Sequence, residues 1–301
     1  MDGKRILVTG PTGQVATPLV RSLAASNEVI GIARFRDPVA RAALEAQGVR
    51  CIEVNLASGE FGGVPDDVDI VLNLAVVKSG RWEVDLKGNA EAAGLLMAHC
   101  RGAEAFVHVS STGVYQHAGA QLLAEDAPLG DNHRGMMPTY SIAKIAAEAV
   151  VRTEARQLGL PTTIARINVP YGDGGGWPAF HLEMLLAGMA IEVHPDRPNL
   201  FNPIHDDDLF AFVPGLVAAA SVPATIVNLG GDQQVALEDW VRELGQLTGR
   251  TPRFVENPSA IGGITTDNTR RLELLGPTRV DWHDGLRRMV ANLHPEALVA
   301  T

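Results

Sequence analysis

Two side chains that could move a proton lie four residues apart, in the segment YSIAK that runs from Tyr140 to Lys144. On a helix, this spacing places both side chains on the same face. A phenol with a pKa of about 10 is a poor acid or base near neutral pH. A nearby ammonium group favours the phenolate, so Tyr140 could exchange a proton with a hydroxyl or carbonyl group of a substrate.

A hydroxyl side chain that could assist this chemistry ends the short run FVHVSS, in which Ser111 is the last residue. If residues 106–110 form a parallel strand, Ser111 lies at its carboxyl end, where open α/β sheets bind ligands. Ser111 could then hydrogen-bond the same substrate oxygen as Tyr140. The alternative is a serine-containing turn at a strand end, which is common. The Tyr–Lys pair later in the chain favours the functional interpretation.

A glycine-rich turn occurs near the N-terminus, where residues 8–16 read VTGPTGQVA between a predicted strand and a predicted helix. Gly10 and Gly13 permit a tight turn and a close approach to a pyrophosphate, toward which the N–H groups of the helix point. Ala16 replaces the usual third glycine and is small enough for close helix–sheet packing. The strand–turn–helix context predicts a dinucleotide site.

The end of the second predicted strand bears on the choice of dinucleotide. An acidic side chain there usually binds the ribose 2′-hydroxyl of NAD(H). In this chain Arg34 and Arg36 follow the strand, and guanidinium groups pair well with phosphate. The sequence therefore favours NADP(H) over NAD(H). The alternative is that both arginines are solvated and Asp37 binds the ribose.

The elements that must position these residues alternate between β and α through the first 170 residues. We expect helices at residues 13–25, 38–47, 83–101 and 139–158. We expect strands at residues 5–8, 28–33, 51–54, 69–73, 106–110 and 163–167. Continuous apolar strands separated by helices predict a parallel sheet that is covered on both faces.

The pattern changes after residue 167, where a glycine-rich loop, YGDGGGW, is expected at residues 171–177. Acidic residues at the start of a helix expected at 207–220 favour its dipole, so we interpret His205 and Asp206–Asp208 as structural. A strand at 225–229, a helix at 237–249 and two short helices follow. We predict an α/β fold whose dinucleotide-binding domain covers residues 1–170, with 204–230 returning to it, and whose small, interleaved substrate lobe covers 171–301.

The composition limits the partners. A net charge of −10 over 301 residues disfavours nucleic acids and anionic membranes, which bind basic surfaces. Without a signal-like segment or a run of 18 apolar residues, the chain is expected to be cytoplasmic. The histidines and the two cysteines show no metal-ligand spacing, so we expect no metal site and free thiols at Cys51 and Cys100. A small-molecule substrate is the expected partner.

Taken together, these motifs resemble the extended branch of the short-chain dehydrogenase/reductase superfamily, the NAD-dependent epimerase/dehydratase family. The likeness covers nearly the full chain through TGPTGQVA, HVSSTGVY, YSIAK, NPIHDDDL, NLGGDQQVALEDWV and LELLGPTRVDWHDGLRRMV. It implies a Rossmann-type doubly wound sheet and catalytic roles for Ser111, Tyr140 and Lys144, with Lys144 also binding the nicotinamide ribose. It also implies a homodimer formed through the two long predicted helices, 83–101 and 139–158.

The resemblance further implies which residues contact the ligands. Asn55 falls where the family places an acidic residue near the adenine, and Asn89 matches a family asparagine with a partly structural role. Substrate contacts are expected from Thr112, Asn168 and Trp177. Cofactor contacts are expected from Gly10, Thr12, Gly13, Gln14, Val15, Arg34, Arg36, Asn55, Leu56, Leu74, Ala75, Val76, Tyr140, Lys144 and Val169.

Two departures from the family pattern narrow the reaction. Thr112 and Gly113 stand where the 4,6-dehydratases carry an Asp-Glu pair, so acid-assisted elimination of water is disfavoured. Val169 and Phe201 stand where nucleotide-sugar enzymes hold the pyrophosphate with an asparagine and an arginine. Either Asn168 and Arg197, which lie nearby in sequence, take these roles, or the substrate is smaller and less anionic. In the second case an apolar pocket could be lined by Trp177, Phe180, Met184 and Phe201.

The main hypothesis is an NADP(H)-dependent oxidoreductase that interconverts a secondary alcohol and a carbonyl group by hydride transfer, with Tyr140 as acid or base. The alternative is a nucleotide-sugar epimerase with tightly bound NAD(P). A third hypothesis is a non-catalytic dinucleotide sensor, and the presence of Tyr140 counts against it. Substrate choice is expected to reside in residues 76–88, 112–137 and 168–205.

Overall fold

The computed structural model describes residues 1–299, which fold into two compact units. Residues 112–138 belong to the second unit and not to the unit that starts at the N-terminus, and the later segment that returns to this first unit is 212–227. The division predicted at residue 170, with 204–230 returning, therefore differs from the arrangement found. Unit 1 consists of residues 1–111, 139–166 and 212–227, and unit 2 of residues 112–138, 167–211 and those from 228 onward.

Unit 1 is built on a seven-stranded parallel sheet with the strand order β13-β7-β5-β4-β1-β2-β3. The order reverses between β1 and β4, which pair in parallel from Ile6 with Ile70 to Thr9 with Asn73. Such a reversal opens a crevice at the carboxyl ends of the strands. The strands are β1 (Arg5–Thr9), β2 (Glu28–Ala33), β3 (Arg50–Glu53), β4 (Ile70–Asn73), β5 (Ala105–Ser111), β7 (Thr162–Ile167) and β13 (Thr225–Leu229).

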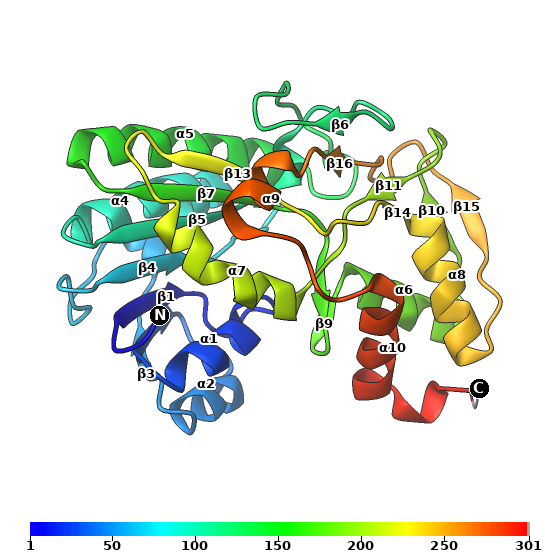
Figure 1. Cartoon of the computed structure of the whole chain (residues 1–301), viewed down its shortest axis with the longest axis horizontal. Coiled ribbons are helices and arrows are strands. Elements are labelled where there is room, and N and C mark those ends of the chain that lie inside the picture. The colour runs from blue at the N-terminus through cyan, green and yellow to red at the C-terminus, as the bar shows by residue number, and fades with distance from the viewer. Residues whose placement is uncertain (300–301) are drawn as a thin grey trace. The chain divides into compact units, whose positions relative to one another are not determined.

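Helices cover both faces of this sheet. Figure 1 shows α4 (Ala92–His99) and α5 (Tyr140–Leu158) on one face, and α1 (Ala16–Ala24) and α2 (Pro38–Glu45) on the other. One core cluster joins Met97 of α4 and Val151 of α5 to side chains of five strands, among them Phe106 of β5. The prediction of a doubly wound sheet is confirmed.

The long helix predicted at residues 83–101 is present as one continuous helical run from Trp82 to His99, but part of that run is not α-helical. The segment contains α3 (Trp82–Leu86), a π-helical stretch at Lys87–Glu91 and α4. Asn89 lies inside the π-helical stretch, where its Nδ2 donates to the Asp85 carbonyl at 2.7 Å. Such local widening of a helix occurs frequently at functional sites.

Unit 2 has short strands in pairs or triplets and several helices. The predicted glycine-rich loop at 171–177 is instead a tight hairpin, β8–β9, from which α6 begins at Trp177. The strands are β6 (Leu122–Leu123), β8 (Pro170–Gly172), β9 (Gly175–Gly176), β10 (Ile191–Val193), β11 (Leu200–Phe201), β12 (Ile204–His205), β14 (Val235–Ala236), β15 (Phe254–Glu256) and β16 (Thr265–Thr266). The helices are α6 (Trp177–Leu186), α8 (Leu237–Thr248), α9 (Thr269–Leu275) and α10 (Trp282–Leu293), and α7 (Asp206–Ala218) starts here and continues into unit 1.

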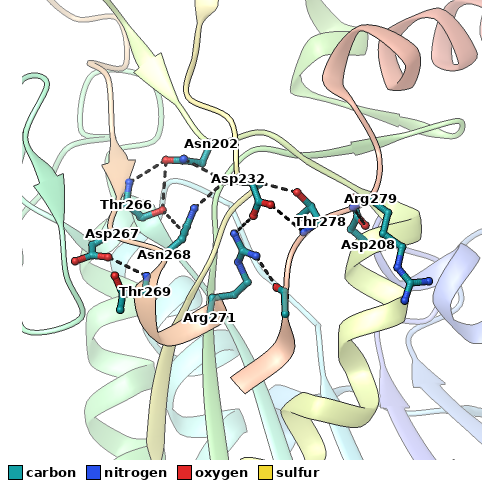
Figure 2. A network of polar contacts seen from close by, with 12 residues as sticks. Asn202, Asp208, Asp232, Thr266, Asp267, Asn268, Thr269, Arg271, Thr278 and Arg279 are labelled. Atoms are coloured by element: carbon teal, nitrogen blue, oxygen red, sulfur yellow. Dashed lines mark hydrogen bonds and ion pairs between the residues drawn. The ribbon is translucent and has the colours of Figure 1, made fainter. Parts of the chain in front are cut away.

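A polar network fixes the segment around α9 within unit 2 (Figure 2). Arg271 is fully buried and pairs with Asp232, and it also donates to the Gly276 carbonyl at 2.7 Å. Asp208 accepts from the backbone N–H of Arg279 at 2.8 Å. The buried Arg271 guanidinium is thus paired with a carboxylate and a backbone carbonyl, which offsets the cost of burying its charge.

Two kinds of feature are absent from residues 1–299. Over that range no helix has the length and apolar character that a membrane crossing requires. Over the same range no group of three or more His, Cys, Asp or Glu side chains is arranged to hold a metal ion.

Candidate active site

A cavity of about 540 Å³ opens in unit 1 at the carboxyl ends of β1, β2, β3 and β4. It lies at the reversal of strand order, where a dinucleotide is expected in this type of sheet. Most residues that the sequence assigned to the cofactor line it, namely Gly10, Thr12, Gly13, Arg34, Arg36, Asn55, Leu56, Leu74, Ala75 and Val76.

The glycine turn gives the cavity its shape. Gly10 has a φ of +63°, and a Cβ there would lie 3.1 Å from the Ala75 Cα. Gly13 closes the turn by donating its N–H to the Gly10 carbonyl at 2.9 Å. Gln14 and Val15 complete the turn before α1 begins at Ala16, and they do not line the cavity. The glycines thus allow the turn to pack closely against Ala75 and to close on itself at the cavity wall, where a nucleotide phosphate could bind.

The loop after β2 carries both predicted arginines. Arg34 and Arg36 are exposed at the cavity and have no ion-pair partner among the residues that the structure describes. Asp37 caps α2 instead, because its Oδ1 accepts from the N–H groups of Val39 and Ala40 at 2.9 and 3.2 Å. One oxygen of the carboxylate that was the alternative ligand for a ribose hydroxyl is therefore used as an N-cap, while Asp37 itself also lines the cavity.

The three predicted catalytic residues lie together in unit 1. Ser111 ends β5, and its side chain hydrogen-bonds that of Tyr140, the first residue of α5. Burial raises the pKa of Tyr140, and the bond with Ser111 opposes that rise. One turn further along α5, Lys144 donates to the Val109 carbonyl at 2.9 Å. The spacing seen in the sequence therefore does place the phenol and the ammonium on one helix beside a hydroxyl.

The ammonium group of Lys144 has a pKa well below that of a free lysine. Burial lowers its pKa to about 8, the charge of Lys78 adds to the lowering, and Glu148 opposes it. With this pKa Lys144 is still mostly protonated at pH 7 and keeps its positive charge beside Tyr140, and lowered pKa values of this kind are common at functional sites.

A chain of buried hydrogen bonds supports the cavity wall next to these residues. Ala75 donates its N–H to Thr9 Oγ1 at 2.9 Å, and Thr9 donates to Asn73 Oδ1 at 2.8 Å. Asn73 Nδ2 lies 3.0 Å from His108 Nδ1. Burial, with a smaller contribution from Lys144, lowers the pKa of His108 to about 3. His108 is therefore neutral, and its Nδ1 accepts from Asn73.

Lys78 is a residue of this site that the sequence interpretation missed. Its Nζ lies 5.4 Å from the centre of the Tyr140 ring, within the range of a cation–π contact. Burial lowers its pKa. The sequence interpretation placed it only within residues 76–88, one of the segments expected to choose the substrate.

The remaining predicted ligand contacts belong to unit 2. Thr112 is buried, and its Oγ1 donates to the Ile167 carbonyl at 3.4 Å. Val169 has a φ of +42°, which is strained for a β-branched residue. Asn168 is fully buried, donates to the Ile264 carbonyl at 2.8 Å and accepts from the Asn202 N–H at 3.3 Å. Both ends of the Asn168 amide are therefore used within the protein.

The residues suggested for an apolar pocket do not form one as a set. Trp177 packs edge-on against Phe201 and Trp240, with ring centres 5.1 and 5.6 Å apart. Phe201 is buried in this aromatic core, whereas Phe180 is 55% exposed. The suggested substitute for a pyrophosphate-binding arginine is also engaged, since Arg197 lies 3.2 Å from a carboxylate oxygen of Glu256.

Unit 2 has a cavity of its own, of about 660 Å³. Two histidines at its wall share one partner, because Asp196 accepts from His117 at 2.9 Å and donates its N–H to His194 at 3.1 Å. Most of its lining falls within the loops expected to choose the substrate, and Pro258–Ala260 lie outside them. The lining residues are Gln116, His117, Asp131, Asn132, Arg134, Gly135, His194, Pro258, Ser259 and Ala260.

Asp206 and Asp207, at the acidic start of α7, have different surroundings in the structure. Asp207 pairs with Arg288 at 2.7 Å, whereas Asp206 is buried against Gly172 and its Oδ1 has no hydrogen-bond partner among the described residues. Burial, with the charges of Asp207 and Asp173, raises the pKa of Asp206 to about 7.

We expect Asp206→Asn to stabilise the protein at alkaline pH. The native state holds the Asp206 proton up to about pH 7, while the unfolded state releases it near 3.8. The native carboxyl group therefore contributes stability below pH 3.8 and loses it as the pH rises through 7. At pH 8 the variant should gain up to about 4 kcal/mol, at about 1.4 kcal/mol per pKa unit. Urea unfolding at pH 5 and pH 8 tests this, and an equal effect at both values would contradict it.

A doubly wound parallel sheet with a glycine turn at the switch point, and a Ser–Tyr–Lys set at a strand end, defines a dinucleotide-dependent enzyme. The model of the NAD dependent epimerase/dehydratase family matches residues 6–201, and the chain belongs to that family. No curated protein matches the chain significantly.

Solved structures of similar fold cover almost the whole chain. UDP-glucuronic acid 4-epimerase from Bacillus cereus, in complex with UDP-glucuronic acid and NAD, is 20% identical with a TM-score of 0.83 and covers 97% of this chain and 99% of its own. MoeE5 with UDP-glucose and NAD is 23% identical, with a TM-score of 0.82 and the same coverage. DesIV, a dTDP-glucose 4,6-dehydratase from Streptomyces venezuelae with bound NAD, is 22% identical with a TM-score of 0.82 and covers 97% of both chains.

Proposed function

We propose that this protein transfers hydride between a secondary alcohol carbon and a nicotinamide dinucleotide, with Tyr140 as the proton donor and acceptor. The observation that carries the proposal is the hydrogen-bonded pair of Tyr140 and Ser111, with Lys144 one turn away, in the same unit as the cavity at the switch point. The dinucleotide, when bound, supplies the hydride acceptor and donor.

The side chains divide the remaining work. Tyr140 takes the proton of the substrate hydroxyl as the carbon is oxidised and returns it on reduction. Lys144 stabilises the phenolate by its charge, which is why its own proton must be retained during that step. Ser111 orients the same substrate oxygen through its hydroxyl group. Tyr140, Lys144 and Ser111 are thus proposed as the catalytic set.

The comparisons favour the epimerase hypothesis over the freely exchanging reductase that the sequence interpretation placed first. We therefore propose an epimerase that retains its dinucleotide, oxidises one carbon of a nucleotide sugar and reduces it from the other face. The two half-reactions need no acid besides Tyr140. A 4,6-dehydratase is not proposed, because Thr112 and Gly113 replace the carboxylates that it would need.

A dehydrogenase of a substrate without a diphosphate is the second candidate, and one observation favours it. Both suggested pyrophosphate ligands are engaged within unit 2, Asn168 with Ile264 and Asn202, and Arg197 with Glu256. A buried diphosphate without paired charges is costly. The buried Asn168 amide is not free to supply that pairing, and Arg197 could supply it only by leaving its exposed partner Glu256.

One purification distinguishes the two candidates. The absorbance and fluorescence of the purified protein report retained dinucleotide, and incubation with UDP-glucose or UDP-glucuronic acid followed by chromatography reports epimerisation. Retained dinucleotide and a new epimer without net change in NADH support the epimerase. Exchangeable dinucleotide and stoichiometric NAD(P)H turnover with a simple alcohol support the dehydrogenase. If the protein binds no dinucleotide at all, the proposal is wrong.

We further propose that the 2′-phosphate of NADP(H) would be bound by Arg34 and Arg36, although the similar structures carry NAD. The double variant Arg34→Ala, Arg36→Ala should weaken NADPH binding about tenfold or more, which is about 1.4 kcal/mol, and leave NADH binding unchanged. Fluorescence titration measures both, with Arg101→Ala, an exposed arginine of unit 1, as the matched control. Equal losses for the two dinucleotides would contradict the 2′-phosphate role.

The homodimer implied by the family resemblance remains a proposal. Leu95 of α4 and Ile142 of α5 are 44% and 36% exposed, so both helices carry apolar side chains that a second copy could cover.

A further inference from the structure

Asp85 of α3 is a fully buried carboxylate whose partners come from two separate segments. From one segment, Ser79 donates its hydroxyl at 2.6 Å and its N–H at 2.9 Å, and Gly80 donates its N–H at 3.0 Å. From the other, Thr139 donates its hydroxyl at 2.5 Å. Burial acts to raise the pKa of Asp85, but these hydrogen bonds outweigh it, and the net pKa is lowered.

The two segments that meet at Asp85 both belong to the candidate active site. Thr139 immediately precedes Tyr140 and α5. Ser79 immediately follows Lys78, whose ammonium group lies over the Tyr140 ring. The loop that carries Lys78 also forms part of the cavity wall through Val76 and Val77.

Asn89 holds the other end of this loop. Its Oδ1 accepts from the Val77 N–H at 2.9 Å, and its Nδ2 donates to the Val77 carbonyl at 2.9 Å. The same Nδ2 donates to the backbone carbonyl of Asp85 at 2.7 Å. Asp85 and Asn89 therefore fix the loop on both sides of Lys78, and Asp85 also accepts a hydrogen bond from Thr139, the residue that precedes α5.

We propose that Asp85 is a positioning residue that clamps Thr139 to the Ser79–Gly80 turn and thereby fixes the Tyr140 phenol beside Lys78 and the cavity wall. Asp85 touches no reacting atom itself. The role of Tyr140 in this statement rests on the proposed function, whereas the clamp rests on the hydrogen bonds alone.

A carboxylate suits this role better than a neutral side chain. An ionised acceptor makes shorter bonds that are about twice as strong as neutral ones, and it can accept several at once. Its desolvation is costly unless every lone pair is used, so the donors from both segments are held firmly in place. A displacement of about 1 Å at a reacting group can lower a rate by about 10²-fold.

The test uses the full-length protein with Thr139→Val, which removes the clamp bond without altering charge, and Asp85→Asn as a second variant. The ionisation of Tyr140 is followed by ultraviolet titration, as the difference between each protein and the same protein carrying Tyr140→Phe. With the clamp removed, the first turn of α5 loosens and water reaches the phenol. The apparent pKa of Tyr140 should therefore fall toward 10 in both variants, and Thr139→Ser should restore the parent value.

The same variants are measured with a substrate of the parent enzyme. We expect kcat to fall about tenfold to a hundredfold, with KM changed far less, because orientation rather than binding is lost. Asp69→Asn is the matched control, since its carboxylate accepts from the Arg5 N–H at 2.7 Å at the amino-terminal edge of the same sheet. That control should lower stability and leave the Tyr140 titration unchanged.

If Thr139→Val and Asp85→Asn lower stability but leave the Tyr140 titration and kcat like the Asp69→Asn control, the clamp is only structural and the proposal is wrong. A failure of the proposed function is a different result. In that case Tyr140→Phe would leave turnover intact, while the titration would still report whether Asp85 holds the phenol in place.

Discussion

Tyr140→Phe is expected to lower kcat by about 10²- to 10⁴-fold, the range over which a positioned acid–base group acts. Phenylalanine keeps the ring beside Lys78 but loses the hydroxyl that Ser111 contacts. Dinucleotide affinity should change little, because the cavity lining remains. Single-turnover absorbance at 340 nm gives the hydride-transfer rate, and fluorescence titration gives the affinity.

Tyr171→Phe is the matched control for this result. Tyr171 is a buried phenol of unit 2, and its hydroxyl lies 3.5 Å from the Trp282 carbonyl. Its removal should leave the hydride-transfer rate near that of the parent protein. If Tyr140→Phe behaved like Tyr171→Phe, the proton would have to come from another group, and the sensor hypothesis would regain support.

Arg166→Leu is expected to cost about 3–5 kcal/mol of unfolding free energy. Arg166 of β7 and Glu148 of α5 are paired at 2.7 Å, and their side chains are only 2% and 3% exposed. Glu148 also accepts from the Ser110 hydroxyl at 2.6 Å. Removal of the guanidinium leaves the Glu148 charge buried without its cation, which is the costly outcome for such a pair.

The double variant Glu148→Leu, Arg166→Leu separates the contribution of the ion pair to the free energy of unfolding from the loss caused by leaving one charge unpaired. Two apolar side chains of similar volume leave no unpaired charge. The double variant should therefore lose less unfolding free energy than Arg166→Leu does. Urea unfolding at neutral pH measures both. If the unfolding free energy of Arg166→Leu lay within about 1 kcal/mol of the parent value, water would have to reach Glu148 in the native state.

Local patterns were sufficient for most of unit 1. Short β-branched runs, separated by helical ones, predicted the strands of the central sheet to within one or two residues, because a strand buried on both faces must be apolar throughout. Tyr140 and Lys144 were recognisable because they share one helix, and Ser111 because strand ends bind ligands in this type of sheet. The glycine turn was recognisable because close backbone contact at Gly10 restricts the residue type.

Contacts between distant segments were not predictable from those patterns. The bond from Thr139 to Asp85 joins residues 54 positions apart, and nothing in either local sequence indicates it. Asn168 was a reasonable pyrophosphate ligand by position, but its amide partners, Ile264 and Asn202, lie far along the chain. The π-helical stretch at Lys87–Glu91 also carries no distinct sequence signal, since its residues are ordinary helix formers apart from Gly88 and Asn89.

The discontinuous make-up of unit 1 has a consequence for how the protein is made. Its sheet includes β13, Thr225–Leu229, which is separated from β7 by residues 168–224, a stretch that includes five short strands and two helices. A ribosome that synthesises the chain from its N-terminus cannot supply this edge strand until three quarters of the polypeptide has emerged. Until then β7 has an open edge, the state in which nascent sheets pair with the wrong partner. A chain truncated at any single point before residue 225 would retain that open edge, so we expect an N-terminal fragment of the dinucleotide unit to aggregate more readily than the full chain.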